Sequence, residues 1–201
     1  MLENLSTAHL ADGCLRVGVQ PRCVALAPVT VGMRVAGPAR VVRHYGSVDI
    51  FLEMLEAAAP GNVLVVDNAG RRDESCVGDL VTIEVKHAGL AGIVIWDTIA
   101  IPPKYGVSDC PSFSLGAVAT GPVRLDARDD LPFGSGSIAV ADSDFVVADD
   151  DGASLEPIAQ AARGIRETEV RQASRVQTGN RYVRSSFFGI LGAPPRQPGV
   201  V

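Results

Sequence analysis

The sequence lacks most of the signals that assign a function class at once. Aromatic residues make up 5% of its 201 residues, and Asp and Glu outnumber Lys and Arg by 23 to 18, a net charge of −5. Because nucleic-acid-binding surfaces usually carry a basic patch, we expect no nucleic-acid partner. No apolar run approaches the ~20 residues of a membrane span, and no Walker or Rossmann phosphate loop is present.

The cysteines also lack a recognisable spacing. The four of them form no C-x-x-C pair, which favours reduced thiols over a zinc site or a disulfide framework. The first residues, MLENLSTAHLADG, contain an acid and no basic segment, unlike a secretory signal. We therefore expect a cytoplasmic protein with no membrane partner.

The overall composition is that of a globular protein. Hydrophobic residues make up 47% of the chain and charged residues 20%, which suffices for one domain with a sizeable core. We expect a single domain over residues 1–192. Residues 193–201, which contain three prolines, are expected to form a flexible tail.

The most informative stretch is a strand-helix-strand pattern between Asn62 and Trp96. Val63–Val66 and Gly92–Trp96 are apolar without polar alternation, which is typical of strands that are buried on both faces of a parallel sheet. Gly78 precedes a helical run over Asp79–His87 that joins the two strands. Since ligands of α/β sheets bind beyond the carboxyl ends of the strands, we expect a pocket there.

The remaining pattern predicts an α/β fold around this unit. Expected helices are Thr7–Val17 with Ser6 as N-cap, a helix that Asp49 caps and Pro60–Gly61 stops, Ser154–Arg175 and Tyr182–Leu191. Expected strands are Ser112–Leu115, Val118–Leu125, Ser137–Val140, Phe145–Ala148, and a strand-pair region over Gly32–Val42 bent at Gly37–Pro38. Phe145–Ala148 is expected to pair with one of the two strands before it, and Asp149–Gly152 to form a turn.

The order of these motifs resembles the RraA-like family. The matching segments are Val63–Asp67, Gly78–Leu80, Ala88–Ile95 and Asp149–Gly152, and the resemblance covers roughly Ser6–Leu191. The family includes 4-hydroxy-4-methyl-2-oxoglutarate aldolases, oxaloacetate decarboxylases and regulators of ribonuclease E. The resemblance implies an α/β/β/α sandwich of the swivelling-domain type. It also implies a homotrimer with active sites between subunits.

The resemblance places a substrate site at the turn Gly78–Val81. In the family's aldolases, backbone N–H groups of this turn receive a carboxylate or oxo group, and the aspartate matching Asp79 holds a water for proton transfer. A helix N-terminus presents unpaired N–H donors and a partial positive charge, so the physics agrees. We expect Asp79 to be catalytic and Leu80 and Val81 to donate from the backbone while their side chains pack inward.

The chain departs from the family where the aldolases carry an Arg-Asp pair. The arginine, which grips substrate oxygens, matches Ala100, and the aspartate, which anchors a divalent metal, matches Ile101. Aldol cleavage needs an electron sink for the enolate. The sequence therefore predicts a divergent member that has lost ordinary aldolase activity.

Other residues are candidates for the lost roles. Asp97 stands where the family has glycine, and with Asp67 and Asp79 it could form an all-oxygen site for Mg²⁺ or Mn²⁺. Alternatively, Asp97 is a turn residue that bonds its own backbone. Arg71 and Arg72 could bind a substrate carboxylate, or could pair with the acids that follow them in a solvated loop.

Two functions stay open from the sequence. The first is a carbon–carbon lyase or related enol-forming enzyme that acts on a small oxo acid or similar anion. The second is a non-catalytic homologue that regulates by binding another protein. The retained Gly78–Asp79 turn favours the first, and the missing Arg-Asp pair favours the second.

Overall fold

The computed structural model describes residues 6–16, 18–44, 46–100, 109–121, 140–142 and 144–156. The predicted helix Tyr182–Leu191, the tail 193–201 and most of the predicted helix Ser154–Arg175 lie outside these residues, as do most of the strands predicted at Val118–Leu125 and Ser137–Val140. No helix in the described part is long and apolar enough to cross a membrane.

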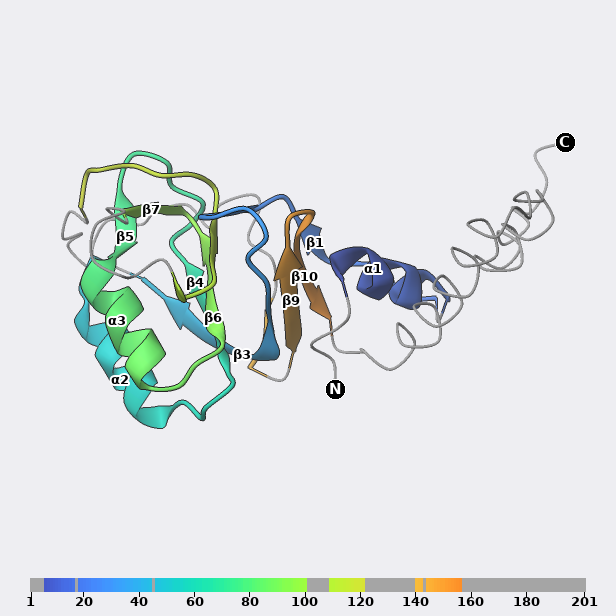
Figure 1. The fold of residues 1–201 in the computed structure, drawn as a ribbon, viewed down its shortest axis with the longest axis horizontal. Helices are drawn as coiled ribbons and strands as arrows, with labels where there is room; N and C mark the ends of the chain where they lie inside the picture. Colours follow the sequence, from blue (N-terminus) through green and yellow to red (C-terminus); the bar gives the residue numbers. More distant parts are fainter. Residues whose placement is uncertain are drawn as a thin grey trace, which may run out of the picture.

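The described chain forms a mixed α/β fold around a curled sheet (Figure 1). Its eight strands lie in the order β1-β10-β9-β3-β4-β6-β8-β2. The two edge strands, β1 (Cys23–Val24) and β2 (Ala27–Pro28), are only two residues apart in the sequence. One short segment therefore supplies both edges, which requires the sheet to curl back on itself.

The centre of the sheet is parallel, as the sequence predicts. Strand β4 (Val63–Asp67) lies between β3 (Val35–Arg43) and β6 (Gly92–Trp96), and both neighbours run parallel to it. Helix α3 (Asp79–His87) joins β4 to β6 by way of a further short strand. The first four residues of β4 and of β6 are buried, because the apolar runs face packed layers on both sides.

Strand β3 is a single strand of nine residues, whereas the sequence predicted a strand pair in this region. Its first residues pair antiparallel with β9 (Phe145–Asp149), and from Ala39 onward it pairs parallel with β4. The change of partner falls at Gly37–Pro38. A Cβ on Gly37 would lie 2.2 Å from the carbonyl oxygen of Gly61, so only glycine permits this close approach.

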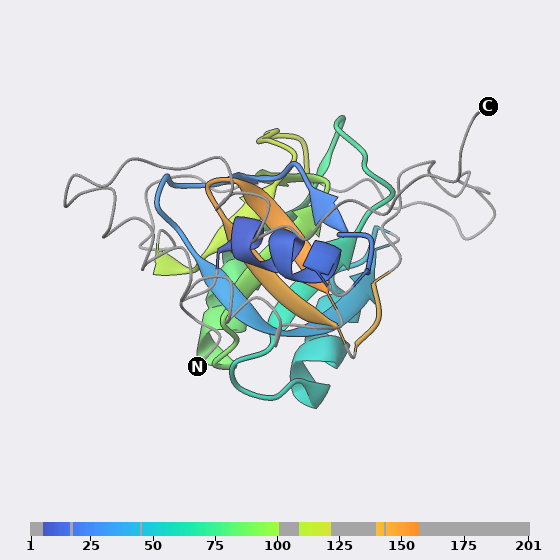
Figure 2. The same cartoon turned by 90° about the vertical axis from the view of Figure 1, so that its right-hand side faces the viewer.

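Helices cover the sheet on two sides. Helices α2 (Asp49–Ala57) and α3 lie side by side and enclose one core against β4 and β6 (Figure 1). Helix α1 (Thr7–Arg16) lies across β9 and β10 (Gly152–Glu156) at the other end of the molecule (Figure 2). A third packing region, inside the curled sheet, contains Phe113 of β8 (Ser112–Ser114).

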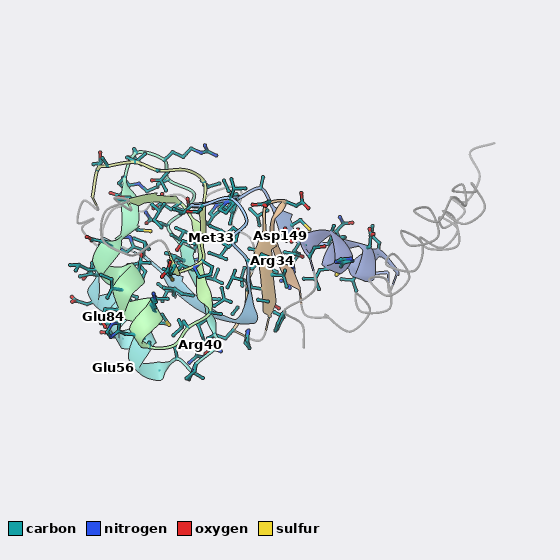
Figure 3. The ribbon with its side chains drawn as sticks, viewed as in Figure 1. Met33, Arg34, Arg40, Glu56, Glu84 and Asp149 are labelled. Carbon is teal, nitrogen blue, oxygen red and sulfur yellow. The ribbon has the colours of Figure 1, made fainter. Side chains whose placement is uncertain are left out.

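The ends of α1 follow the predicted capping pattern. Ser6 Oγ accepts the His9 N–H at 3.2 Å, so Ser6 is the N-cap, and Gly18 follows the helix with φ +76°. Asp149 lies on β9, on the side of the molecule that carries α1 (Figure 3). Its carboxylate accepts hydrogen bonds from both N and Oγ1 of Thr7, at 3.0 and 2.6 Å. These bonds tie the start of α1 to the sheet.

Several element predictions are wrong. Ser154 does not begin a helix, because it lies in β10, which forms a hairpin with β9 around the predicted turn. β9 therefore pairs with β10 on one side and β3 on the other, and not with either strand predicted at Val118–Leu125 and Ser137–Val140. Asp49 is the first residue of α2 and Val48 is its N-cap. Between 118 and 121 the backbone forms no strand.

Candidate functional site

A two-stranded parallel ladder brings the predicted turn beside the family's arginine position. Strand β5 (Ser75–Gly78) pairs with β7 (Thr98–Ala100), and Gly78 lies in register with Ala100. Neither of these two strands was predicted from the sequence. Since the two strands are parallel and end together, the start of α3 and Ala100 lie at the same edge of the fold.

The turn itself differs from its predicted form in one respect. The Leu80 side chain is 73% exposed, so the expectation that it packs inward is wrong, whereas Val81 packs against the core under α3. The Leu80 N–H donates to Oδ1 of Asp79 at 2.9 Å. The Asp79 carboxylate therefore occupies one of the backbone donors that an incoming anion would use.

A second group of polar side chains gathers where the parallel strands of the main sheet end. His44 follows β3, Asn68 follows β4 and Asp97 follows β6, and all three are almost fully buried. Asn68 Nδ2 donates to Asp97 Oδ2 at 2.6 Å, and Asn68 Oδ1 lies 3.2 Å from His44 Nδ1. The amide of Asn68 thus connects the ends of three neighbouring strands.

Glu74 and Arg71 extend this buried cluster. Asn68 Nδ2 also lies 3.3 Å from Glu74 Oε1, and Arg71 Nη1 lies 2.8 Å from the same oxygen. Arg71 further holds Asp73 through two hydrogen bonds, of 3.1 and 2.9 Å. Two roles were considered for Arg71, binding of a substrate carboxylate and pairing with the acids that follow it. In the structure, Arg71 pairs with these acids. Arg72 is exposed and forms no ion pair with any described residue.

Burial sets the protonation of the cluster. It raises the pKa of Asp97, a shift that the Asn68 hydrogen bond opposes, and it lowers the pKa of His44. The pKa of the Cys76 thiol is raised, first by burial and then by the neighbouring Asp97 charge. Each of these three pKa shifts favours the neutral form of its group. Among the described residues, Asp97 Oδ1 and His44 Nε2 are buried atoms without a hydrogen-bond partner.

The described oxygen donors do not fit the metal site considered from the sequence. Asp97 is 0% exposed and lies just before Thr98, which pairs with Ser75 at the opposite end of the ladder from Gly78. Asp67 lies 3.3 Å from the Arg43 guanidinium. The described ranges contain no group of three or more His, Cys, Asp or Glu side chains that could hold a metal ion. Binding of Mg²⁺ or Mn²⁺ stays a prediction.

The loop between β4 and β5 is held against β6. Ala69 and Gly70 both have positive φ, +57° and +69°, and the Gly70 N–H donates to the Trp96 carbonyl at 3.1 Å. A Cβ on Gly70 would lie 2.9 Å from Trp96 Nε1. Thr98 Oγ1 donates to the Glu74 carbonyl, which secures the far end of the loop.

Sequence reasoning missed His44, Asn68 and Glu74 as members of this cluster. His44 and Asn68 do have a sequence signal, because each is the first or second polar residue after an apolar run. Asp97 has the same placement after β6. Polar residues at equivalent ends of parallel strands are brought together by the register. Glu74 has no such signal, since it reaches the cluster through the fold of the loop.

The arrangement of strands and turn agrees with a comparison against known families. A family model described as "RraA-like: Aldolase/RraA" matches residues 7–154. The chain belongs to the RraA-like family. The predicted family and its mixed α/β fold are thereby confirmed. The match leaves the proposed domain limits of 1–192 untested.

Individual RraA-like relatives are distant. A "Putative 4-hydroxy-4-methyl-2-oxoglutarate aldolase" of Halalkalibacterium halodurans is 26% identical over 73% of this chain and 70% of its own length. Protein DlpA of Legionella pneumophila is 22% identical over 89% of this chain, but the chain spans only 31% of that protein. The crystal structure of Streptomyces coelicolor RraAS2, "an unusual member of the RNase ES inhibitor RraA protein family", is 25% identical with a TM-score of 0.64. The match covers 89% of this chain and 93% of that one.

Proposed function

We propose that this RraA-like chain binds a small oxo acid at the Gly78 turn and acts on it as a carbon–carbon lyase or related enol-forming enzyme. The observation that carries the proposal is the register of Gly78 with Ala100. This register supports a site in which the backbone of the turn is the same as in the family. The family's arginine side chain is replaced there by the methyl group of Ala100.

In this proposal the backbone and Asp79 supply the chemistry. First-turn N–H groups of α3 hold the carboxylate or oxo group, since the helix N-terminus carries a partial positive charge. Asp79, through a water, takes a proton from the substrate, and the same water then returns a proton to the carbon of the enolate that has formed. The negative charge on the enolate oxygen needs a further stabiliser.

Arg72 is our candidate for that stabiliser. Arg71 is held by Asp73 and Glu74, whereas Arg72 is exposed and forms no ion pair in the described part of the chain. No step is assigned to a divalent metal, because Asp97 is buried against Asn68 and Asp67 lies beside Arg43. Addition of Mg²⁺ or Mn²⁺ is therefore an arm of each binding experiment.

A second candidate function is regulation by protein binding. The replacement of the arginine by Ala100 and the 73% exposure of Leu80 both favour it, because an exposed leucine beside an apolar position suits a protein contact. The solved relative from Streptomyces coelicolor carries the word inhibitor in its description. The assays below separate the two candidates.

We further propose that the chain assembles as a homotrimer. Val31 is 86% exposed, and contacts between subunits would cover such an apolar side chain. Light scattering at micromolar concentration is expected to give three times the chain mass, and a monomer mass would contradict the proposal. A cytoplasmic location and the lack of a nucleic-acid partner stay predictions.

Two assays test the enzymatic proposal. Cleavage of 4-hydroxy-4-methyl-2-oxoglutarate with Mg²⁺ is expected to be slight, because loss of one electrostatic donor typically lowers rates by about 10²–10³-fold. Deuterium exchange at the methyl group of pyruvate, followed by NMR, is expected to be accelerated by the parent and lost in Asp79→Ala. Lack of exchange in the parent with any metal would favour the regulatory candidate.

A further inference from the structure

The residue in register with Gly78 is apolar, at the position where the family has its arginine. Ala100 lies in register with Gly78, and its carbonyl oxygen is 3.5 Å from the place of a Cβ on Gly78. Of Gly78–Val81 and the residues of β7, only Asp79 carries a charge. That charge is negative, as is the charge of an acid substrate.

The other side of β7 is apolar as well. Ile99 forms a parallel bridge with Ala117, and its carbonyl accepts the Val118 N–H at 3.2 Å. Ala117 is exposed and Val118 is partly buried. Strand β7 thus lies between the Gly78 turn and a second backbone segment whose neighbouring side chains are methyl and isopropyl groups.

Leu80 adds a larger apolar group at the turn. It is 73% exposed, although it lies in the first turn of a helix whose Thr82 and Val85 are buried. Exposed apolar surface favours contact with a hydrocarbon group over contact with a charge. The turn therefore offers backbone donors for one carboxylate and apolar side chains for what is attached to it.

From these observations we propose that the ligand of this turn is a 2-oxo monocarboxylate with an apolar carbon chain. The inference rests on the proposed function and concerns the substrate class of that same site. A dicarboxylate with its second carboxylate at the far end would place that charge near Asp79, where residue 100 is alanine and Arg72, the proposed stabiliser of the enolate oxygen, is already committed to the oxo group. An alkyl chain in the same place meets Leu80 and Ala100.

The most direct test compares two acids of equal length. 2-Oxopentanoate and 2-oxoglutarate share a five-carbon backbone and differ only in the terminal carboxylate. Calorimetry on the full chain is expected to give at least tenfold tighter binding of 2-oxopentanoate. Along pyruvate, 2-oxobutyrate and 2-oxopentanoate, affinity is expected to rise by about fourfold for each methylene that is fully buried.

Variants at the two apolar positions localise the effect. Ala100→Arg is expected to reverse the preference toward 2-oxoglutarate, whereas Ala100→Leu, which adds bulk without charge, is expected to keep it. Leu80→Ala is expected to weaken 2-oxopentanoate binding several-fold and to leave pyruvate binding unchanged. Leu52→Ala, at a leucine that is 49% exposed on α2, is the matched control and is expected to change neither.

The outcomes separate this inference from the proposed function. Equal or tighter binding of 2-oxoglutarate by the parent overturns the apolar-chain inference and leaves the Gly78 site standing. Tighter binding of 2-oxopentanoate that is insensitive to Leu80→Ala and to Ala100→Arg overturns the assignment to this turn. Failure of every acid to bind, with and without Mg²⁺, overturns the inference and the proposed function together.

Discussion

Asn68 and Asp97 form a buried hydrogen bond of 2.6 Å between Nδ2 and Oδ2. The bond connects the residue after β4 with the residue after β6, and both side chains are almost completely buried. Asp97 stands where the resemblance implies a glycine, and its carboxylate accepts the hydrogen bond from Asn68 at the start of the β4–β5 loop. Its position agrees with a structural role more closely than with the metal-binding role considered from the sequence.

The first prediction concerns Asn68. Asn68→Ala removes a donor shared by two buried carboxylates, so the free energy of unfolding is expected to fall by about 1–3 kcal/mol. Urea unfolding can be followed through the fluorescence of Trp96, the single tryptophan of the chain. Asn62→Ala is the control, because Asn62 Oδ1 accepts the Ala59 N–H at an exposed site. Equal losses in the two variants would contradict a special role for Asn68.

The second prediction is a pH dependence that comes from Asp97. Burial raises the pKa of this carboxyl, so between the unfolded and folded pKa values the folded state binds more protons than the unfolded state. The contribution of Asp97 to stability is therefore present below about pH 4 and is lost as the pH rises through the folded pKa.

Asp97→Asn removes this titration and keeps the shape of the side chain. The free energy of unfolding of Asp97→Asn, relative to the parent, is expected to increase from pH 4 upward, as measured by urea unfolding at a series of pH values. Asp142→Asn, at an exposed carboxylate paired with Arg40, is a control that should show no comparable trend. A constant difference between Asp97→Asn and the parent across this range would contradict the raised pKa.

The third prediction concerns the loop contact of Gly70 with Trp96. Gly70→Ala places a methyl group 2.9 Å from Trp96 Nε1 at a residue with φ +69°. Gly61→Ala has a similar φ of +83° and no atom within 4 Å, so it measures the backbone term alone, about 1–2 kcal/mol. Gly70→Ala is expected to lower the free energy of unfolding by clearly more than Gly61→Ala does. It is also expected to change the fluorescence emission of Trp96 in the folded state. An equal loss of stability in Gly70→Ala and Gly61→Ala would show that the loop can move away from Trp96 without a further loss of free energy.

The fourth prediction separates binding from proton transfer at Asp79. The Asp79 carboxylate accepts the Leu80 N–H at 2.9 Å. Asp79→Ala frees this donor and removes a negative charge, so oxalate is expected to bind several-fold more tightly while any proton exchange of pyruvate is lost. Calorimetry and NMR measure the two effects on the same samples. Weaker binding by Asp79→Ala would mean that the carboxylate helps to hold the ligand.

The central unit of the fold could be predicted from the sequence. Val63–Val66 and Gly92–Trp96 are apolar without alternation, and Gly78 and Gly89 punctuate the helix between them, so local signals agree with the tertiary arrangement. The β5–β7 ladder could not be predicted in this way. Ser75–Gly78 and Thr98–Ala100 are short, and their pairing depends on how the chain returns after β6.

Parts of the candidate site also could not be predicted from the local sequence pattern. The exposure of Leu80 depends on the surface around α3, not on the residue type. The hydrogen bond between Asn68 and Asp97 joins residues 29 positions apart, and only the parallel register of β4 and β6 brings them together. Ser154 reads as a helix start, but the antiparallel hairpin of β9 and β10 overrides that local preference.

The central claim is that the Gly78 turn binds a small anion. Its most direct test is calorimetry with oxalate, whose adjacent carboxylates occupy the place of the carboxylate and oxo group of pyruvate, with and without Mg²⁺ or Mn²⁺. A Cβ at Gly78 would lie 3.5 Å from Ala100 O, an ordinary contact, so Gly78→Val is expected to fold while its side chain stands over the turn. We expect binding by the parent and at least tenfold weaker binding by Gly78→Val. Equal affinities for the two proteins, or no binding under any metal condition, would contradict it.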